Sequence, residues 1–272
     1  MAVGEPSITR NSTWTVETVQ VCGRDISFQK GGSGPPLLLL PRDNGHPPRH
    51  EFLDLLAADF TVCYPWLPGF HSGHPDGWQW LANVRDLAIV QRQLVESLHL
   101  GRLTVVGLGF GGWVAAEMAT MAPGLLERLV LVAPMGVQPV NGYIYDQFIV
   151  GSETYARAGF ADQAAFDAVY GAEPDFDQLE SWETDREMTS RLAWKPYMYN
   201  PTLPGLLAGV AAPTLILWGD ADQVVPAECG EAFRASMPNA SLEVVAHAGH
   251  AVDVEQPRAL AGRVAAFCKN AT

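Results

Sequence analysis

Residues 103–116 read LTVVGLGFGGWVAA, and this stretch decides the fold. The apolar run from Leu103 to Val106 predicts a buried strand, the glycines after it predict a tight turn, and the alanine-rich segment from about Gly111 predicts a helix. A strand–turn–helix with the pattern G-x-S-x-G displays a nucleophilic serine at the edge of a sheet. Here the pattern is G-L-G-F-G, and Gly109 stands in the position of the serine. Because glycine has no side chain, the stretch predicts the turn of an enzyme without its usual nucleophile.

Two polar residues follow later strands of the same kind. The apolar run 213–218 leads to Asp222, and a predicted strand at 242–246 leads to His250. The carboxyl ends of parallel strands meet at one edge of a sheet, where such proteins bind their ligands. In the chain order nucleophile, acid, base, an Asp orients a His that activates a serine. The sequence therefore predicts that Asp222 and His250 lie beside Gly109.

These three motifs, in this order, resemble those of the α/β-hydrolase superfamily, most closely the esterases, epoxide hydrolases and meta-cleavage-product C–C hydrolases. The resemblance runs from about Trp14 to Phe267. It implies an α/β fold in which helices flank a mostly parallel central sheet. It also implies two parts of the chain, a core domain of residues 1–135 and 208–272 and a helical cap, or lid, of residues 136–207.

The resemblance assigns roles around the turn. His250 would be the base and Asp222 the acid that orients it, whereas Gly109 leaves the nucleophile position vacant. An oxyanion would be stabilised by backbone N–H groups, which the family pattern places at Phe110, Asn44 and Gly45.

Several residues near the turn depart from the family pattern. Leu108 replaces a frequent His, Pro41 stands where the loop after the third strand usually begins His-Gly, and Trp66 replaces a usual Asp. Departures at several positions around one cavity indicate that the sequence diverged naturally from the family pattern, more than that a single residue was changed in the laboratory.

The segment between Met135 and roughly Leu207 breaks the alternation of strands and helices and is rich in aromatic residues. A cap closes a site from water and supplies substrate contacts. Most of these rings are expected to form the core of the cap, and some to face the cavity. The expected ligand is an apolar or aromatic small molecule, contacted by Leu108, Pro41, Arg191, Trp194, Tyr143 and Tyr145. Arg191 would pair either with a carboxylate or enolate of the substrate or with a neighbouring acid.

Other polar residues are alternatives for roles in the site. Asp220 competes with Asp222 for the role of the acid, and His247 is expected at the surface or behind the base. His46, in the altered loop, is expected either to be exposed or to reach the cavity. Ser72 matches a structural turn of the family and is not expected to act as a nucleophile.

Three functions remain open. The leading one is an enzyme without the serine nucleophile, whose His–Asp pair acts as general acid and base in a lyase, cyclase, hydration or C–C cleavage reaction. The second is a catalytically silent protein that binds a ligand. The third is an ordinary serine esterase or C–C hydrolase changed from Ser to Gly at position 109. The small residues around the turn also predict that Gly109→Ser would be accommodated and would restore weak ester hydrolysis.

Composition narrows the function classes. A net charge of −13 over 272 residues disfavours nucleic acid and anionic membranes as partners. No run approaches the roughly 18 apolar residues of a membrane span, and no secretion signal is visible, so a cytoplasmic protein is expected. The four cysteines lack metal-ligand spacing, and the glycine pattern lacks the spacing of a dinucleotide fingerprint. Neither a metal nor another cofactor is therefore expected, and the oligomeric state is left open.

Overall fold

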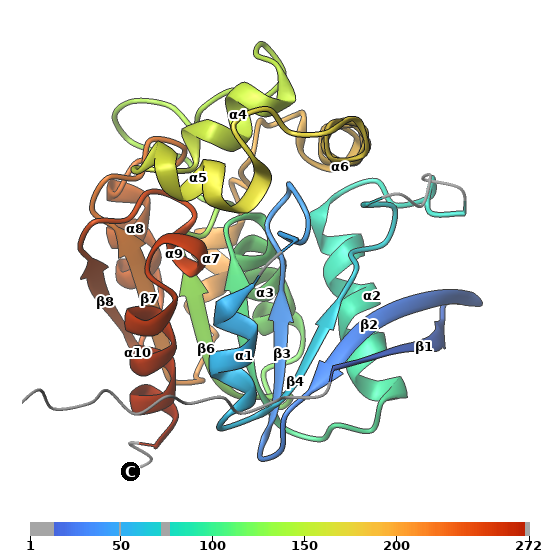
Figure 1. Ribbon diagram of the computed structural model, residues 1–272. Coiled ribbons are helices and arrows are strands. Elements are labelled where there is room, and N and C mark those ends of the chain that lie inside the picture. The colour runs from blue at the N-terminus through green and yellow to red at the C-terminus, as the bar shows by residue number, and fades with distance from the viewer. Residues whose placement is uncertain (1–13, 49, 72–76, 270–272) are drawn as a thin grey trace, which may run out of the picture.

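The computed structural model describes residues 14–48, 50–71 and 77–269. In this part of the chain, eight strands form one sheet in the order β1-β2-β4-β3-β5-β6-β7-β8 (Figure 1). The first two pairings, β1 with β2 and β2 with β4, are antiparallel, and all others are parallel. The predicted mostly parallel sheet is thereby confirmed. The strands are β1 (Thr15–Val21), β2 (Arg24–Gly31), β3 (Pro36–Leu40), β4 (Thr61–Pro65), β5 (Leu103–Leu108), β6 (Leu126–Val132), β7 (Thr214–Gly219) and β8 (Ala240–Val245).

The central strands are apolar along their whole length because both faces of the sheet are covered. Alternate residues of β3 point to opposite faces: Leu38 and Leu40 belong to one core cluster, and Leu37 and Leu39 to another. Every residue of β5 and β7 is buried. A strand that is buried on both faces reads as a continuous apolar run rather than as an alternation.

Helices cover both faces of the sheet (Figure 1). One core cluster lies between the sheet and the helices of the first face, and the other lies between the sheet and the helices of the second face. The helices of the first face are α2 (Val84–Ser97), α3 (Phe110–Met121), α7 (Leu203–Leu207) and α8 (Glu228–Ser236). Those of the second face are α1 (Glu51–Ala57), α9 (Val252–Glu255) and α10 (Pro257–Lys269).

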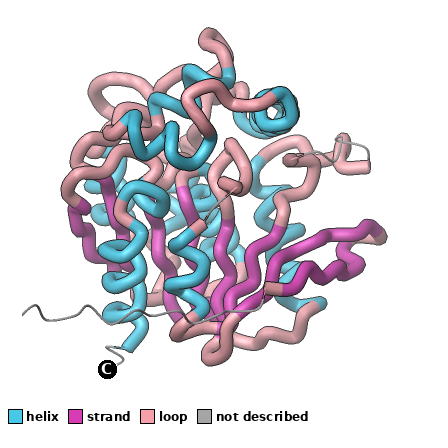
Figure 2. Tube along the Cα trace, in the orientation of Figure 1, coloured by secondary structure: helices cyan, strands magenta, loops and turns pink. Residues whose placement is uncertain are grey.

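Three helices between β6 and β7 lie over the carboxyl ends of the strands, at the top of Figures 1 and 2. They are α4 (Ser152–Ala158), α5 (Gln163–Tyr170) and α6 (Phe176–Ala193). Their aromatic side chains form a separate small core that contains Phe160, Phe166, Tyr170 and Trp182. The following helix, α7, packs instead against α3 and α8 of the body. The boundaries of the cap at residues 136 and 207 stay a prediction.

Among the described residues, no helix combines the length and the apolar character that a membrane span requires. The expectation of a cytoplasmic protein stays a prediction.

The turn after β5 depends on a close approach between this strand and α3. A Cβ atom on Gly107 would lie 2.4 Å from the carbonyl oxygen of Gly111 and 2.6 Å from the Cα of Gly112. Both contacts are backbone atoms of the helix, which cannot rotate away as a side chain does. Only glycine at position 107 therefore lets α3 begin directly above the strand.

We expect Gly107→Ala to lower the free energy of unfolding by about 1–3 kcal/mol, the usual effect of overpacking a tight contact. Gly124→Ala is the matched control, because a Cβ atom there meets nothing within 4 Å. Urea unfolding of both variants measures the difference. Equal stability of the two variants would contradict the tight approach of β5 and α3.

Candidate active site

The turn between β5 and α3 has a backbone that favours glycine. Gly109 has φ +50° and ψ −112°, a region that L-residues with side chains rarely adopt. Its N–H donates to the carbonyl of Val132 at 2.9 Å, and its own carbonyl accepts from Met135 at 3.1 Å. Phe110 is the first residue of α3, so its N–H has no acceptor within the helix and points toward the same edge of the sheet.

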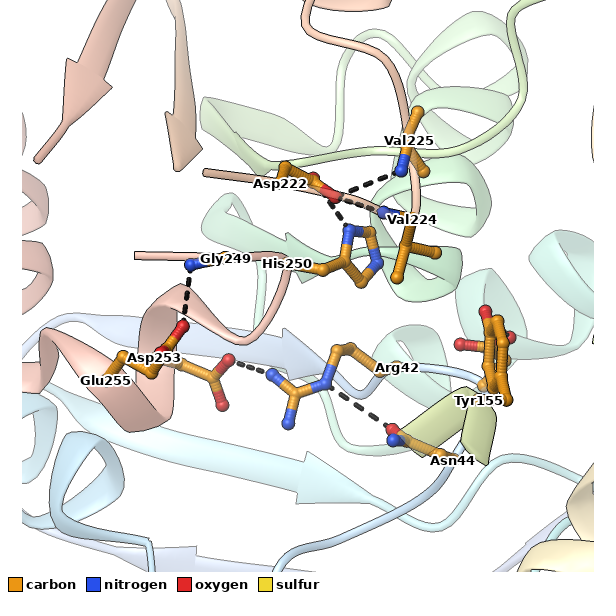
Figure 3. Close-up of polar contacts among 11 residues, drawn as sticks. Arg42, Asn44, Tyr155, Asp222, Val224, Val225, Gly249, His250, Asp253 and Glu255 are labelled. Atoms are coloured by element: carbon orange, nitrogen blue, oxygen red, sulfur yellow. Dashed lines mark hydrogen bonds and ion pairs between the residues drawn. The ribbon is translucent and has the colours of Figure 1, made fainter. Parts of the chain in front are cut away.

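His250 and Asp222 meet beside this turn (Figure 3). His250 follows β8, Asp222 follows β7, and the Nδ1 atom of the histidine lies 2.9 Å from Oδ2 of the aspartate. The other carboxylate oxygen accepts the backbone N–H groups of Val224 at 2.8 Å and Val225 at 3.0 Å. Both side chains are buried, with 4% and 1% exposed. Because the carboxylate accepts at Nδ1, that nitrogen carries the proton and Nε2 is left as the basic atom.

The alternatives to this pair lie elsewhere. Asp220 is exposed and accepts the N–H of Ala248 at 3.2 Å instead of contacting the imidazole. His247 is also exposed. Ser72 lies outside the described residues.

The imidazole of His250 lies against the turn. A Cβ atom on Gly109 would be 2.7 Å from Nε2 of His250 and 3.2 Å from Cγ of Arg42. Real Cβ atoms do not approach a neighbour as closely as the first of these distances. A serine at position 109 therefore requires the far end of the imidazole to shift away from the turn. The expectation that this serine is accommodated stays a prediction.

Arg42 forms a buried ion pair that sequence reasoning missed. Its guanidinium group contacts the carboxylate of Asp253, which also binds Nε2 of His50 at 2.9 Å. Its Nε–H donates to the side-chain oxygen of Asn44 at 3.4 Å. Figure 3 shows the arginine below His250, between Asp253 and Asn44. Burial alone would raise the pKa of Asp253, but the charge of Arg42 and the bond from His50 lower it to about 2.

The loop after β3 is bent into a turn by its own hydrogen bonds. The N–H of Gly45 donates to the carbonyl of Arg42 at 3.2 Å, and Gly45 has φ +75°. This N–H was expected to stabilise an oxyanion, but it is already engaged in the turn, so that assignment is wrong. Asn44 faces the cavity beside His250 through its side chain.

A small cavity lies next to His250, which we call the His250 cavity. Its volume is about 10 Å³, room for about one water molecule. Tyr155 of α4 closes it from the cap side and donates its hydroxyl hydrogen to Asp43 at 2.8 Å. Gln147 donates to the same carboxylate oxygen at 2.8 Å. The lining residues are Arg42, Asp43, Asn44, Tyr155, Ala156, Gly159, Phe160, Val224, His250 and Ala251.

Three cap residues expected to contact a ligand face the solvent instead. Tyr143 is 73% exposed and Trp194 is 57% exposed. Arg191 forms a surface ion pair with Glu187 at 3.6 Å, one turn before it on α6. Tyr143 lies in the loop before α4, Trp194 follows the last residue of α6, and Arg191 lies on the exposed side of α6. Tyr145 comes nearer to the site, since its ring stacks on that of Tyr155 with centroids 6.3 Å apart.

The two expected ligand contacts from the body are buried. Leu108 is 2% exposed and belongs to the core cluster on the α1 side of the sheet. Pro41 is buried, and its carbonyl would lie 2.3 Å from a Cβ atom on Gly111, so it packs against the start of α3. Neither residue lines the His250 cavity.

His46 is neither exposed nor at the His250 cavity. Its ring stacks on Tyr64 with centroids 3.8 Å apart and on Trp66 at 4.9 Å. Burial, together with the neighbouring His50 and His71, lowers its pKa to about 3, so the ring is neutral. Its Nε2–H donates to the carbonyl of Pro65 at 3.0 Å. His46 is thus a packing residue of the loop. Among the described residues, no cluster of three or more His, Cys, Asp or Glu side chains is arranged to hold a metal ion.

Asp185 of α6 is a buried acid at the contact between cap and body. One of its oxygens accepts the N–H of His71, and the other has no hydrogen-bond partner. Burial, with a smaller contribution from the nearby Asp43, raises the pKa of Asp185 to about 8. The carboxyl group is therefore protonated and uncharged at neutral pH.

We expect Asp253→Asn to cost about 3–5 kcal/mol of stability, because it leaves Arg42 as a buried charge without a partner. The lowered pKa gives the sign of the pH effect. In the wild-type protein the stabilisation is complete above about pH 4 and is lost as the pH falls toward 2. Glu51→Gln is the control, since it breaks an exposed pair with Arg258 and is expected to cost less than about 1 kcal/mol. Equal losses of unfolding free energy for Asp253→Asn and Glu51→Gln in urea would contradict a stabilising role of the buried Arg42–Asp253 pair.

We expect the stability of the wild-type protein to fall as the pH rises from about 4 to about 8, because in this range the unfolded state releases the proton of Asp185 while the folded state retains it. The slope from this group approaches about 1.4 kcal/mol per pH unit within that range and vanishes above about pH 8, where both states are ionised. Asp185→Asn keeps the shape of the side chain and is expected to remove this part of the pH dependence. Asp177→Asn, on the exposed start of the same helix, is expected to retain it. Parallel stability curves for wild type and Asp185→Asn between about pH 5 and about pH 8 would contradict the raised pKa.

Comparisons with known proteins agree with this architecture. The sequence pattern of the alpha/beta hydrolase family matches residues 37–263. An uncharacterized protein of Mycobacterium tuberculosis is 26% identical over 261 residues, which cover 87% of this chain and 76% of that protein. A 2-hydroxy-6-oxononadienedioate/2-hydroxy-6-oxononatrienedioate hydrolase of Paraburkholderia xenovorans is 27% identical over 213 residues, 72% of each chain. The structure is similar to that of a membrane phospholipase A, with a TM-score of 0.77 and 23% identity over 95% of this chain and 87% of that chain.

The family match extends from β3 to α10 and includes the turn at Gly109, Asp222 and His250. It spans far more than half of the chain, and the order of strands and helices agrees with it. The chain therefore belongs to the alpha/beta hydrolase family.

Proposed function

We propose that this chain is an enzyme in which His250, held by Asp222, acts as general acid and base on a small molecule beneath the cap, without a covalent step. The observation that carries the proposal is the state of Nε2 of His250. This atom is buried, has no hydrogen-bond partner and belongs to a residue that lines a cavity. The opposite nitrogen is fixed by a carboxylate that itself accepts two backbone N–H groups.

This arrangement suits proton transfer better than nucleophilic attack. A histidine with a fixed tautomer, acting as general acid and base, accelerates proton transfer by about 10²- to 10⁴-fold. An acyl-enzyme needs a nucleophile at position 109, and the glycine there supplies none. The hydrolases among its relatives support an enzymatic role for the family. Lyase, cyclase, hydration and C–C cleavage reactions all fit a base of this kind.

The cavity modifies the expectation of an apolar or aromatic substrate. Polar side chains form half of the lining: Arg42, Asp43, Asn44, Tyr155 and His250. A purely apolar ligand would leave Nε2 of His250 without a hydrogen-bond partner, which costs about 1–3 kcal/mol for a buried group. We therefore propose a small molecule that combines an apolar part with polar groups directed at His250.

A second candidate is a ligand-binding protein without catalysis. The glycine at position 109 is compatible with it, because binding needs no nucleophile. The third interpretation, a serine hydrolase altered at position 109, requires the far end of the His250 side chain to shift, since Nε2 lies 2.7 Å from a Cβ atom at that position.

The experiment that separates an enzyme from a binding protein begins with a thermal-shift screen of small metabolites, followed by product analysis for each stabilising compound. A ligand at 100 times its dissociation constant stabilises the folded state by about 2.7 kcal/mol, which is readily measured. In an enzyme, His250→Ala is expected to reduce turnover by about 10²- to 10⁴-fold while the compound still binds. His247→Asn changes an exposed histidine three residues away and is expected to leave turnover unchanged.

Two results would reject the proposed enzyme. One is turnover that is unaffected by His250→Ala. The other is robust labelling of a side chain in the His250 cavity by a fluorophosphonate, which reports an activated nucleophile. Binding without product formation for every stabilising compound would favour the binding protein.

A further inference from the structure

A second small cavity lies beside the His250 cavity, and we call it the Trp182 cavity. Its volume is also about 10 Å³. The two cavities share Asp43, Asn44 and Tyr155 as common walls. The remaining lining of the second cavity comes from the cap, from Gln147, Ser152, Trp182 and Arg186. The two spaces are therefore neighbours, separated only by side chains of the loop after β3 and of α4.

Each cavity is lined by a residue with a buried polar atom that has no partner. In the first it is Nε2 of His250, and in the second it is Nε1 of Trp182. Trp182 is only 2% exposed, within the small core of the cap. A buried N–H without an acceptor is unfavourable by about 1–3 kcal/mol, so such atoms call for an explanation. A ligand oxygen in each cavity would provide one.

Nε2 of His250 needs a hydrogen-bond donor as its partner, whereas Nε1 of Trp182 needs an acceptor. Because Nδ1 of His250 donates to Asp222, its Nε2 accepts a hydrogen bond. Tyr155 donates its hydrogen to Asp43, so its oxygen also has only acceptor capacity left toward the His250 cavity. The indole of Trp182 is a donor only. The His250 cavity therefore suits a hydroxyl group, and the Trp182 cavity suits a carbonyl oxygen.

The charges near the two cavities disfavour an anion. Arg42 is balanced by Asp253, and Arg186 lies 3.6 Å from Glu183 on the surface of α6. The carboxylates left over next to the ligand space are Asp43 and Asp222. A carboxylate brought between them would meet like charges in a poorly solvated place, whereas a neutral hydroxyl would not.

We propose that the two cavities form one binding site for a small neutral hydroxycarbonyl molecule, whose hydroxyl donates to His250 and whose carbonyl oxygen accepts from Trp182. The identification of this molecule as a substrate class rests on the proposed function, whereas the binding site rests on the cavities and their unpartnered atoms. The hydroxyl then lies on the basic nitrogen, where its proton is available for transfer. The indole N–H lies where a carbonyl oxygen is polarised.

The test uses the indole N–H signals of the ¹⁵N-labelled protein, which has eight tryptophans. Trp182→Phe and Trp218→Phe each remove one signal and so assign both. Trp218 is the matched control, because its Nε1 is also buried without a partner but lines neither cavity. The probes share a three-carbon skeleton: hydroxyacetone, acetone, 1-propanol and lactate. We expect hydroxyacetone to shift the Trp182 signal in a saturable manner and to leave the Trp218 signal unchanged.

Acetone is expected to shift the same signal more weakly, and 1-propanol and lactate are expected to have little effect. Removal of one neutral hydrogen bond weakens binding by about 5-fold, so Trp182→Phe is expected to raise the Kd of hydroxyacetone by that factor, and Trp218→Phe to leave it unchanged. The proposal is overturned if the Trp182 signal does not move, if 1-propanol moves it as much as hydroxyacetone does, or if lactate binds more tightly. The signal shifts are read in the wild-type protein, and a conventional sequential assignment of that protein replaces the variants if one of them folds poorly.

Binding and catalysis are separated in the same experiment. A saturable shift at Trp182 without conversion of any hydroxycarbonyl compound would retain this binding site and reject the proposed enzyme. Turnover that depends on His250 but leaves the Trp182 signal unmoved would retain the enzyme and reject this binding site.

Discussion

The buried ion pair between Arg42 and Asp253 connects the two segments on which the candidate site depends. Arg42 lies on the loop after β3, and Asp253 lies in α9, three residues beyond His250. Both side chains are almost completely buried, with 3% and 1% exposed. Removal of one partner would leave an uncompensated charge in a poorly solvated place, so the loop and α9 are held together. The stem of the arginine also lies against the turn at Gly109, where it helps to fill the space that a serine side chain would use.

This packing is favourable for glycine at position 109. The left-handed backbone, the stem of Arg42 and the imidazole of His250 all converge on the position of the missing side chain. In a serine hydrolase the hydroxyl group stands between the turn and the histidine. Here the histidine itself contacts the turn, and its basic nitrogen is available to a ligand. The loss of the nucleophile and the position of the base are therefore parts of one arrangement.

The sequence was sufficient to predict the sheet, the turn and the pairing of His250 with Asp222 in space, because each depends on short motifs at strand ends. It was insufficient for the Arg42–Asp253 pair, since the two residues are 211 positions apart and each has an ordinary local context. It also assigned the wrong cap residues to the ligand. Tyr155 and Trp182 lie in the same aromatic segment as Tyr143 and Trp194, but the first two are buried on helices, whereas Tyr143 lies in a loop and Trp194 at the end of α6. An aromatic composition contains no signal of these placements.

Hydrogen bonds between the cap and the body limit the space beside His250. Asp43 accepts hydrogen bonds from Tyr155 and Gln147, and Ser181 of α6 contacts the ring of His71 at 3.0 Å. These bonds connect the cap to the body, and the cavities between them have room for only about one water molecule each. The proposed ligand would therefore have to displace side chains and break some of these bonds. A hydroxyl group that donates to the same acceptors would replace the lost hydrogen bonds, whereas an apolar ligand would not.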